Sequence, residues 1–186
     1  MLNKESDTVP ISPEEYNKIL SMQQELLSLT AYDGETQTTL NRLCTIAESL
    51  LPNAVASIML YDKSKNSLYV KAAPTVPNSG WDAINGIVPG PYSGSCGNAV
   101  YRAEAQYIIN TLEDERGRDF VETAKAFGLC SCWSMPIKNE LQECVGSFAL
   151  SSFECRSPAL FHKKLLEVCS TITTIVLKSE KMALYD

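Results

Sequence analysis

The sequence predicts one α+β domain, with a mainly antiparallel sheet at its centre. Apolar residues recur at helical spacing near both ends of the chain, whereas the middle holds two pairs of short apolar segments, each pair joined by a polar turn. The chain has 186 residues, 45% of them hydrophobic, which suffices for one core. We expect the terminal helices on one sheet face and a ligand pocket roofed by loops and short helices on the other.

The longer helices are predicted at residues 12–31, 35–51 and 158–182. Ser12, Pro13 and Glu15 match a capping box that would start the first of them. Residues 1–11 are expected to be a disordered leader, so that 12–182 form the single domain. The last helix carries a 4-3-4-3 apolar stripe, which is typical of a seam between paired helices; the stripe consists of Phe161, Leu165, Val168, Ile172, Ile175 and Met182.

The strands are expected to form two hairpins and one short additional strand. The first strand is apolar on both faces, which indicates a sheet covered on both sides. A long loop rich in proline and glycine follows the first hairpin, and such loops in compact domains are usually functional. The expected strands are 54–61, 67–73, 106–109, 130–138 and 143–151; the loop is 74–91, and shorter helices are expected at 95–103 and 119–127.

Charge and segment lengths exclude several classes of protein. The formal net charge is −6 and Lys and Arg do not cluster, so we expect no nucleic-acid partner. The apolar runs are too short to span a bilayer, and the N-terminus lacks the apolar segment of a signal peptide. We therefore expect a cytoplasmic protein without a membrane partner. Since the sequence ends at Asp186 directly after a predicted helix and shows no output domain, we expect an excised module or one that signals through a partner protein.

Seven cysteines at irregular spacing, without a C-x-x-C pair, and one histidine, His162, predict no metal site. Reduced, mostly buried thiols are the simplest interpretation. Cys130, Cys132 and Ser134 would share one face of a strand. No nucleophile, acid or base constellation is recognisable, so we assign no catalytic residue and expect a domain that binds and reports rather than an enzyme.

The segment Ser93–Tyr101 (SGSCGNAVY) places glycines at the start of a helix. The first backbone N–H groups of a helix have no intrahelical partner, which suits them to a small, partly anionic ligand. Cys96 would there be either a thiol of lowered pKa or a small residue that lets a ligand approach the backbone. Trp81, in the long loop, would be either a lid over the pocket or an anchor of the loop.

Five segments in order resemble the GAF domain over residues 35–177. They are SIMLYD (57–62), the glycine turn 86–90, SGSCGNAVY (93–101), GLCSCWSMPI (128–137) and VGSFALS (145–151). The chain is most similar to the GAF domains that precede diguanylate cyclase, cyclic-di-GMP phosphodiesterase and histidine kinase outputs in bacterial signalling proteins.

The resemblance implies a sensory domain that binds a small ligand and controls an output domain, here cyclic-di-GMP metabolism as the first expectation. Cyclic AMP or cyclic GMP would be the ligand, and the terminal helices would pair in a homodimer. The phosphate would lie at Ser95, Cys96 and Gly97. The complete set of candidate ligand-binding residues is Ser57, Trp81, Ser95, Cys96, Gly97, Asn110, Thr111, Phe120, Cys132 and Ser134.

Two alternatives stay open at this point. The first is a thiol-redox sensor that uses Cys96 with Cys130 or Cys132, and the second is a ligand-free dimerisation module. Cys96 also matches a cysteine of the GAF enzymes that reduce methionine sulfoxide. Residues 110–126 contain no cysteine to act as their nucleophile, however, so the sequence does not predict that activity.

Overall fold

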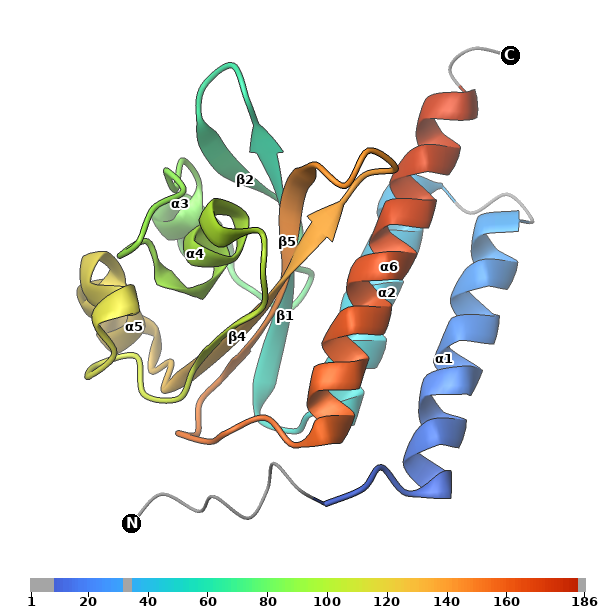
Figure 1. Ribbon diagram of the computed structural model, residues 1–186, viewed down its shortest axis with the longest axis horizontal. Coiled ribbons are helices and arrows are strands. Elements are labelled where there is room, and N and C mark those ends of the chain that lie inside the picture. Colours follow the sequence, from blue (N-terminus) through green and yellow to red (C-terminus); the bar gives the residue numbers. More distant parts are fainter. Residues whose placement is uncertain (1–8, 32–34, 184–186) are drawn as a thin grey trace.

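The computed structural model describes residues 9–31 and 35–183, with only the backbone at 181–183; most of the predicted leader therefore lies outside the described residues. A five-stranded antiparallel sheet, in the order β2-β1-β5-β4-β3, forms the centre of the molecule (Figure 1). This confirms the predicted α+β class. The strands are β1 (Ala54–Asp62), β2 (Ser67–Ala72), β3 (Gln106–Ile108), β4 (Ser131–Lys138) and β5 (Cys144–Ser152).

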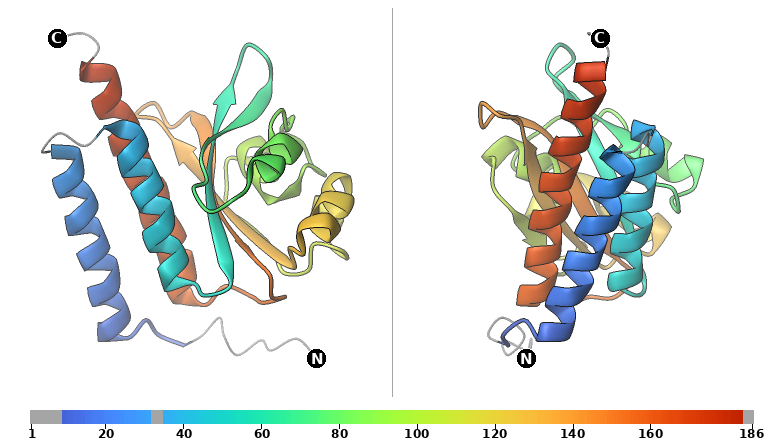
Figure 2. Two further views of the ribbon diagram at one scale, coloured as in Figure 1. Left: turned by 180° about the vertical axis from the view of Figure 1, so that it is seen from behind. Right: turned by 90° about the vertical axis from the view of Figure 1, so that its right-hand side faces the viewer.

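Three long helices cover one face of the sheet. They are α1 (Pro13–Ala31), α2 (Thr36–Leu50) and α6 (Leu160–Ala183). Helices α2 and α6 pack directly on the strands, and α1 lies outside them and contacts both (Figure 2). The terminal helices thus share the face on which they were expected.

The predicted capping box is present at the start of α1. The Ser12 backbone N–H donates to Oε2 of Glu15 at 2.7 Å, and the Glu15 N–H donates to Oγ of Ser12 at 3.2 Å. Two N–H groups that the helix itself leaves unpaired are satisfied in this way.

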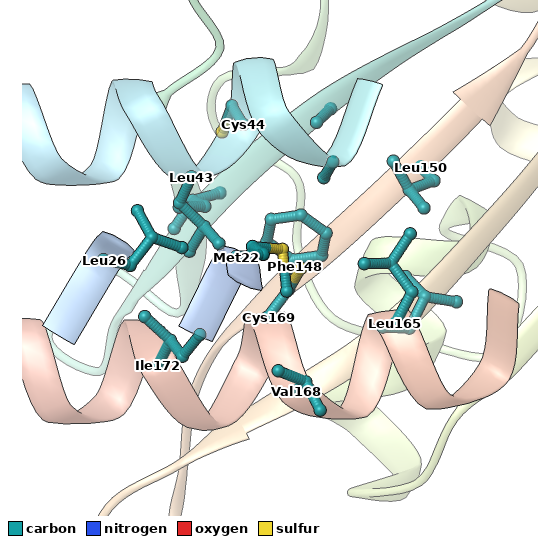
Figure 3. Close-up of a cluster of buried hydrophobic side chains, with 14 of the residues drawn as sticks. Met22, Leu26, Leu43, Cys44, Phe148, Leu150, Leu165, Val168, Cys169 and Ile172 are labelled. Carbon is teal, nitrogen blue, oxygen red and sulfur yellow. The ribbon is translucent and has the colours of Figure 1, made fainter. Parts of the chain in front are cut away.

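The helices and the sheet enclose the main hydrophobic core (Figure 3). Phe148 and Leu150 of β5 face Leu165 and Cys169 of α6 in this layer, and all four side chains are buried. The predicted stripe of α6 lies mostly here, because Phe161, Leu165, Val168 and Ile172 are buried within the chain. Ile175 is 42% exposed, and the side chain of Met182 lies outside the described residues.

Short helices cover the opposite face of the sheet (Figure 1). They are α3 (Asn78–Ile84), α4 (Gly94–Arg102), the 3-10 helix η2 (Glu115–Phe120) and α5 (Val121–Phe127). Helix α4 contacts β4 and β5 directly and also contacts η2, and η2 in turn contacts α5. No helix in the described part of the chain is long and apolar enough to cross a membrane.

Candidate ligand-binding site

Strand alternation decides which side chains face the short helices. Successive side chains of a strand point to opposite faces. On β1, Ala56 and Ile58 belong to the helix-side core, whereas Val55, Ser57 and Met59 line a cavity on the other side. The same alternation divides β4 and β5, so the two faces of one sheet have different chemistry.

The start of α4 forms one wall of this cavity. Gly94 has a φ of +68°, which favours glycine, and a Cβ there would lie 3.5 Å from the ring of Phe120. At Gly97 a Cβ would come within 2.6 Å of the Cβ of Ser93. The two glycines thus let the helix begin close against its own loop and η2. Gly94, Ser95 and Cys96, which carry the first backbone N–H groups of α4, all line the cavity.

The cavity has a volume of about 360 Å³. Pockets for small molecules typically measure about 300–1,000 Å³ and are mostly apolar with a few polar groups. None of the described residues that line this cavity carries a charged side chain. Besides the residues named above, its lining includes Thr75, Ile84, Ile87, Ile108, Thr111, Thr123, Phe127, Leu129, Cys132, Ser151 and Phe153.

Hydroxyl and thiol groups gather where α4 meets β4 and β5. Ser95 Oγ lies 2.8 Å from Cys132 Sγ and 2.8 Å from Ser134 Oγ. Ser134 Oγ is also 3.3 Å from Cys96 Sγ, and Cys132 Sγ lies 3.0 Å from Ser151 Oγ. This network, which we call the thiol–hydroxyl cluster, places thiol and hydroxyl groups together at one side of a mostly apolar cavity.

The two thiols of the cluster titrate in opposite directions. A hydrogen bond from Cys132 lowers the pKa of Cys96 below its usual value, and the nearby hydroxyls of Ser134, Ser147 and Ser95 add to the effect against the desolvation by burial. The same contact with Cys96, together with burial, raises the pKa of Cys132. Cys96 is therefore the thiol that ionises first, with Cys132 as its hydrogen-bond donor.

Six of the ten candidate residues line the cavity, and four do not. Gly97 packs against Ser93, and Ser134 lies behind Ser95 and Cys96. The six candidates that line the cavity are Ser57, Ser95, Cys96, Thr111, Phe120 and Cys132.

The other two candidates have structural roles outside the cavity lining. Trp81 donates its indole N–H to the carbonyl of Ala73 at 3.2 Å, as expected for an anchor of the loop. Asn110 accepts the backbone N–H of Leu112 through Oδ1 at 3.1 Å and so stabilises the turn before η2.

Several lining residues were not predicted. Val55 and Met59 lie two positions on either side of Ser57, so strand periodicity would have identified both. Thr123, Phe127 and Phe153 come from a seven-residue helix and from the loop after β5. Neither segment has a sequence pattern that shows which side chains face the sheet.

A disulfide between Cys130 and Cys155 corrects the expectation that the thiols are reduced throughout. It joins the residue before β4 to the loop that leads from β5 to α6. Cys130 is thereby removed as a partner for Cys96, which leaves Cys132. Among the described residues, no group of three or more His, Cys, Asp or Glu is arranged to hold a metal ion.

The sequence profile of the GAF domain matches residues 35–176, which is most of the chain. The chain belongs to the GAF domain family. A curated relative, the methyl sulfide methyltransferase-associated sensor of Methanosarcina acetivorans, is 28% identical over 145 residues. That alignment covers 78% of this chain but only 14% of the relative, so the chain corresponds to a small part of that sensor.

Solved structures of GAF domains share the fold. The GAF domain of an Acinetobacter phosphoenolpyruvate-protein phosphotransferase superposes with a TM-score of 0.72 at 13% identity, covering 92% of this chain and 98% of that one. Free methionine-R-sulfoxide reductase from Neisseria meningitidis gives a TM-score of 0.74 at 13% identity, with coverages of 95% and 98%. The Staphylococcus aureus reductase, in reduced form, gives 0.68 at 18% identity, covering 86% and 94%.

These reductases correct the expectation that the domain is not an enzyme. They are enzymes with the same fold, so a GAF fold without a recognisable catalytic constellation does not establish a purely binding role. At these identities the likeness concerns the fold alone. It transfers no substrate or catalytic residue to this chain.

Proposed function

We propose that this GAF domain is a sensory module whose cavity binds one small ligand, with an apolar body and a single polar or anionic group. The observation that carries the proposal is the cavity itself: about 360 Å³, apolar over most of its lining, and open to the start of α4. The apolar body would lie against Met59, Phe120 and Phe127. The polar group would lie at the N–H groups of Ser95 and Cys96, where the helix dipole favours negative charge.

Cyclic AMP and cyclic GMP are the ligands to test first. Their phosphate is a single anion that fits the N-terminus of α4, and their base is flat enough to pack on aromatic rings. Because the described lining contains no arginine or lysine, the phosphate would be held by backbone and hydroxyl groups only. An apolar carboxylate matches the same features and is the second class of ligand to test.

The signal would pass from the cavity to α6 through β4. This strand carries Cys132 on the cavity side, and α6 packs on its other face. Two hydrogen bonds tie the helix to the strand: Ser170 Oγ donates to the Pro136 carbonyl at 2.7 Å, and Thr174 Oγ1 donates to that of Lys138 at 3.0 Å. A ligand that shifts β4 would therefore shift α6.

A homodimer would present this movement to an output domain or partner protein, in the cytoplasm. Since the stripe of α6 is mostly buried within the chain, the outer face of α1 is the better surface for a second copy. Tyr16, Leu20 and Leu27 lie on one side of that helix and are 53%, 51% and 43% exposed. Control of cyclic-di-GMP metabolism is one output of this kind, and the M. acetivorans relative is itself a sensor.

A thermal-shift titration with a matched pair of variants tests the ligand proposal. Thr123 and Ala126 lie on the same helix, α5, but only Thr123 lines the cavity. A ligand at about 100 times its Kd should raise the Tm of the parent by roughly 5 to 10 °C. Thr123→Trp should abolish this rise and Ala126→Trp should preserve it. An equal rise in both variants would place the ligand elsewhere, and no rise with either ligand class would favour a ligand-free dimerisation module.

Sedimentation tests the dimer. Leu20→Glu should convert it to a monomer, whereas Ser21→Glu, on another side of α1, should not. A parent chain that sediments as a monomer at high concentration would contradict the proposal.

A further inference from the structure

The thiol–hydroxyl cluster places two free cysteines from different elements at the end of an apolar cavity. Cys96 comes from α4 and Cys132 from β4, and both line the cavity. The same two hydroxyls connect them: Ser95 Oγ contacts Cys132 Sγ and Ser134 Oγ, and Ser134 Oγ contacts Cys96 Sγ. Any molecule that fills the cavity would thus meet a pair of thiols.

We propose that Cys96 and Cys132 form a peroxidatic pair that an organic hydroperoxide oxidises to a disulfide. The inference uses the same cavity as the proposed function but requires no ligand to be bound. An apolar cavity would concentrate the organic group of such a peroxide beside Cys96, whereas hydrogen peroxide has no apolar part for it to bind.

The surroundings of Cys96 favour its thiolate. The residue lies in the first turn of the nine-residue helix α4, where the dipole favours an anion. Ser147 of β5 is fully buried, and its hydroxyl has no hydrogen-bond partner among the described residues, yet it contributes to the lowered pKa of Cys96. A negative charge on the Cys96 sulfur would give this hydroxyl an acceptor.

The chemistry balances without a further reactant. The Cys96 thiolate attacks the terminal oxygen of ROOH, the O–O bond breaks, and the alkoxide takes a proton from solvent and leaves as ROH. Cys96 is then a sulfenic acid. The Cys132 thiol attacks its sulfur, the S–O bond breaks, and water leaves as the disulfide forms. Two thiols lose two electrons in total, and the peroxide gains them.

Peptide mapping after oxidation tests the pair. Protein in which Cys96 and Cys132 are reduced is treated with cumene hydroperoxide or with hydrogen peroxide at equal concentration. The disulfide-linked peptides are then quantified over time. We expect a Cys96–Cys132 link that forms at least about tenfold faster with cumene hydroperoxide. Equal rates for the two peroxides, or no such link, would overturn the proposal.

Cysteine variants distinguish the residue that attacks the peroxide, Cys96, from the residue that completes the disulfide, Cys132. Cys132→Ser should leave a sulfenic acid on Cys96 that dimedone traps, and Cys96→Ser should remove both the trapping and the link. Cys144→Ser, at a half-buried free cysteine outside the cavity lining, is the matched control and should react as the parent does. Dimedone labelling of Cys144 in preference to Cys96 would contradict the assignment.

A last experiment distinguishes the peroxidatic pair from the reversible ligand binding of the proposed function. Under reducing conditions, in which the Cys96–Cys132 disulfide does not form, a reversible ligand should still raise the Tm of the parent. Thr123→Trp on the cavity wall should slow cumene hydroperoxide more than hydrogen peroxide. If it slows both equally, the cavity does not select the peroxide, and the proposal fails while ligand binding can still hold.

Discussion

Two pairs of cysteines lie on opposite faces of the same sheet, and their surroundings differ. Cys44 and Cys169 are enclosed by leucine, methionine and phenylalanine side chains in the helix-side core (Figure 3). Burial raises the pKa of both thiols. Cys96 and Cys132 lie among serine hydroxyls at the end of a cavity, and there the pKa of Cys96 is lowered. The same residue type is thus inert packing on one face and a potential nucleophile on the other.

The contrast extends to how each face is held together. The helix side is a closely packed core, in which removing atoms leaves a void. The cavity side contains empty volume, and α4 is joined to the sheet partly by the hydrogen bonds of the thiol–hydroxyl cluster. Stability should therefore depend on the helix side, and ligand response on the cavity side.

Two phenylalanines on opposite faces provide the strongest test of this contrast. Phe148 is fully buried in the helix-side core, whereas Phe120 is half-buried and lines the cavity. Phe148→Ala should lower the free energy of unfolding by about 3–5 kcal/mol. Phe120→Ala should lower it by roughly 1 kcal/mol, because the side chain already borders empty space. Urea unfolding monitored by circular dichroism gives both values, and equal losses would contradict the comparison.

The disulfide should have the next largest effect. It closes a segment with a sequence separation of 25 residues, so its loss should destabilise the domain by about 3 kcal/mol through the entropy of the unfolded chain. Cys155→Ser measures this in urea, with Cys144→Ser as the control for losing a cysteine that is not bonded. A Cys155→Ser variant as stable as the parent would show that the bond does not form in solution.

The rate of alkylation and its dependence on pH should differ between the cysteines on the two faces of the sheet. An ordinary thiol has a pKa near 8.5, so only about 3% is thiolate at pH 7. The lowered pKa of Cys96 keeps its thiolate populated to lower pH, so iodoacetamide should label it at pH 7 about tenfold faster than the same residue in urea. Cys169 should be protected in the folded protein and react only in urea. Labelling of Cys96 that falls away below pH 8.5, as for an ordinary thiol, would contradict the lowered pKa.

The sequence predicts the helices and strands that form the two faces of the sheet better than it predicts the residues that line the cavity. The strand at 54–61, apolar on both faces, and the helical spacing at both ends of the chain are local features of the sequence, and the structure has both: β1 lies in a sheet covered by helices on both faces, and long helices lie near both ends of the chain. The candidate at Ser57 comes from the resemblance to GAF domains, whereas those at Ser95 and Cys96 also follow from the glycine-rich start of a helix, which is a local feature.

Other parts of the site depend on contacts that a sequence does not show. Phe153 and Thr123 belong to a loop and to a short helix, whose orientation is decided by packing against the sheet. The Cys130–Cys155 pair joins two segments that only the fold brings together. The sequence predicts two possible roles for Trp81, because an aromatic side chain in a loop serves equally well as a lid or as an anchor. Its hydrogen bond to Ala73 favours the anchor.

The smallest loss of stability is expected at the capping box of α1. A change there, on the helix side of the sheet, should not affect the cavity on the other side. Ser12→Ala removes the Oγ acceptor of the Glu15 N–H and should cost about 1 kcal/mol. Ser21→Ala, exposed in the middle of the same helix, should cost nothing, because alanine is a better helix former. Neither change should alter the alkylation rate of Cys96, since α1 packs on α2 and α6 on the far side of the sheet. A Cys96 rate that changes with Ser12→Ala but not with Ser21→Ala would instead show that the terminal helix and the cavity are coupled through the sheet. The sensory proposal requires such coupling only when the cavity is filled.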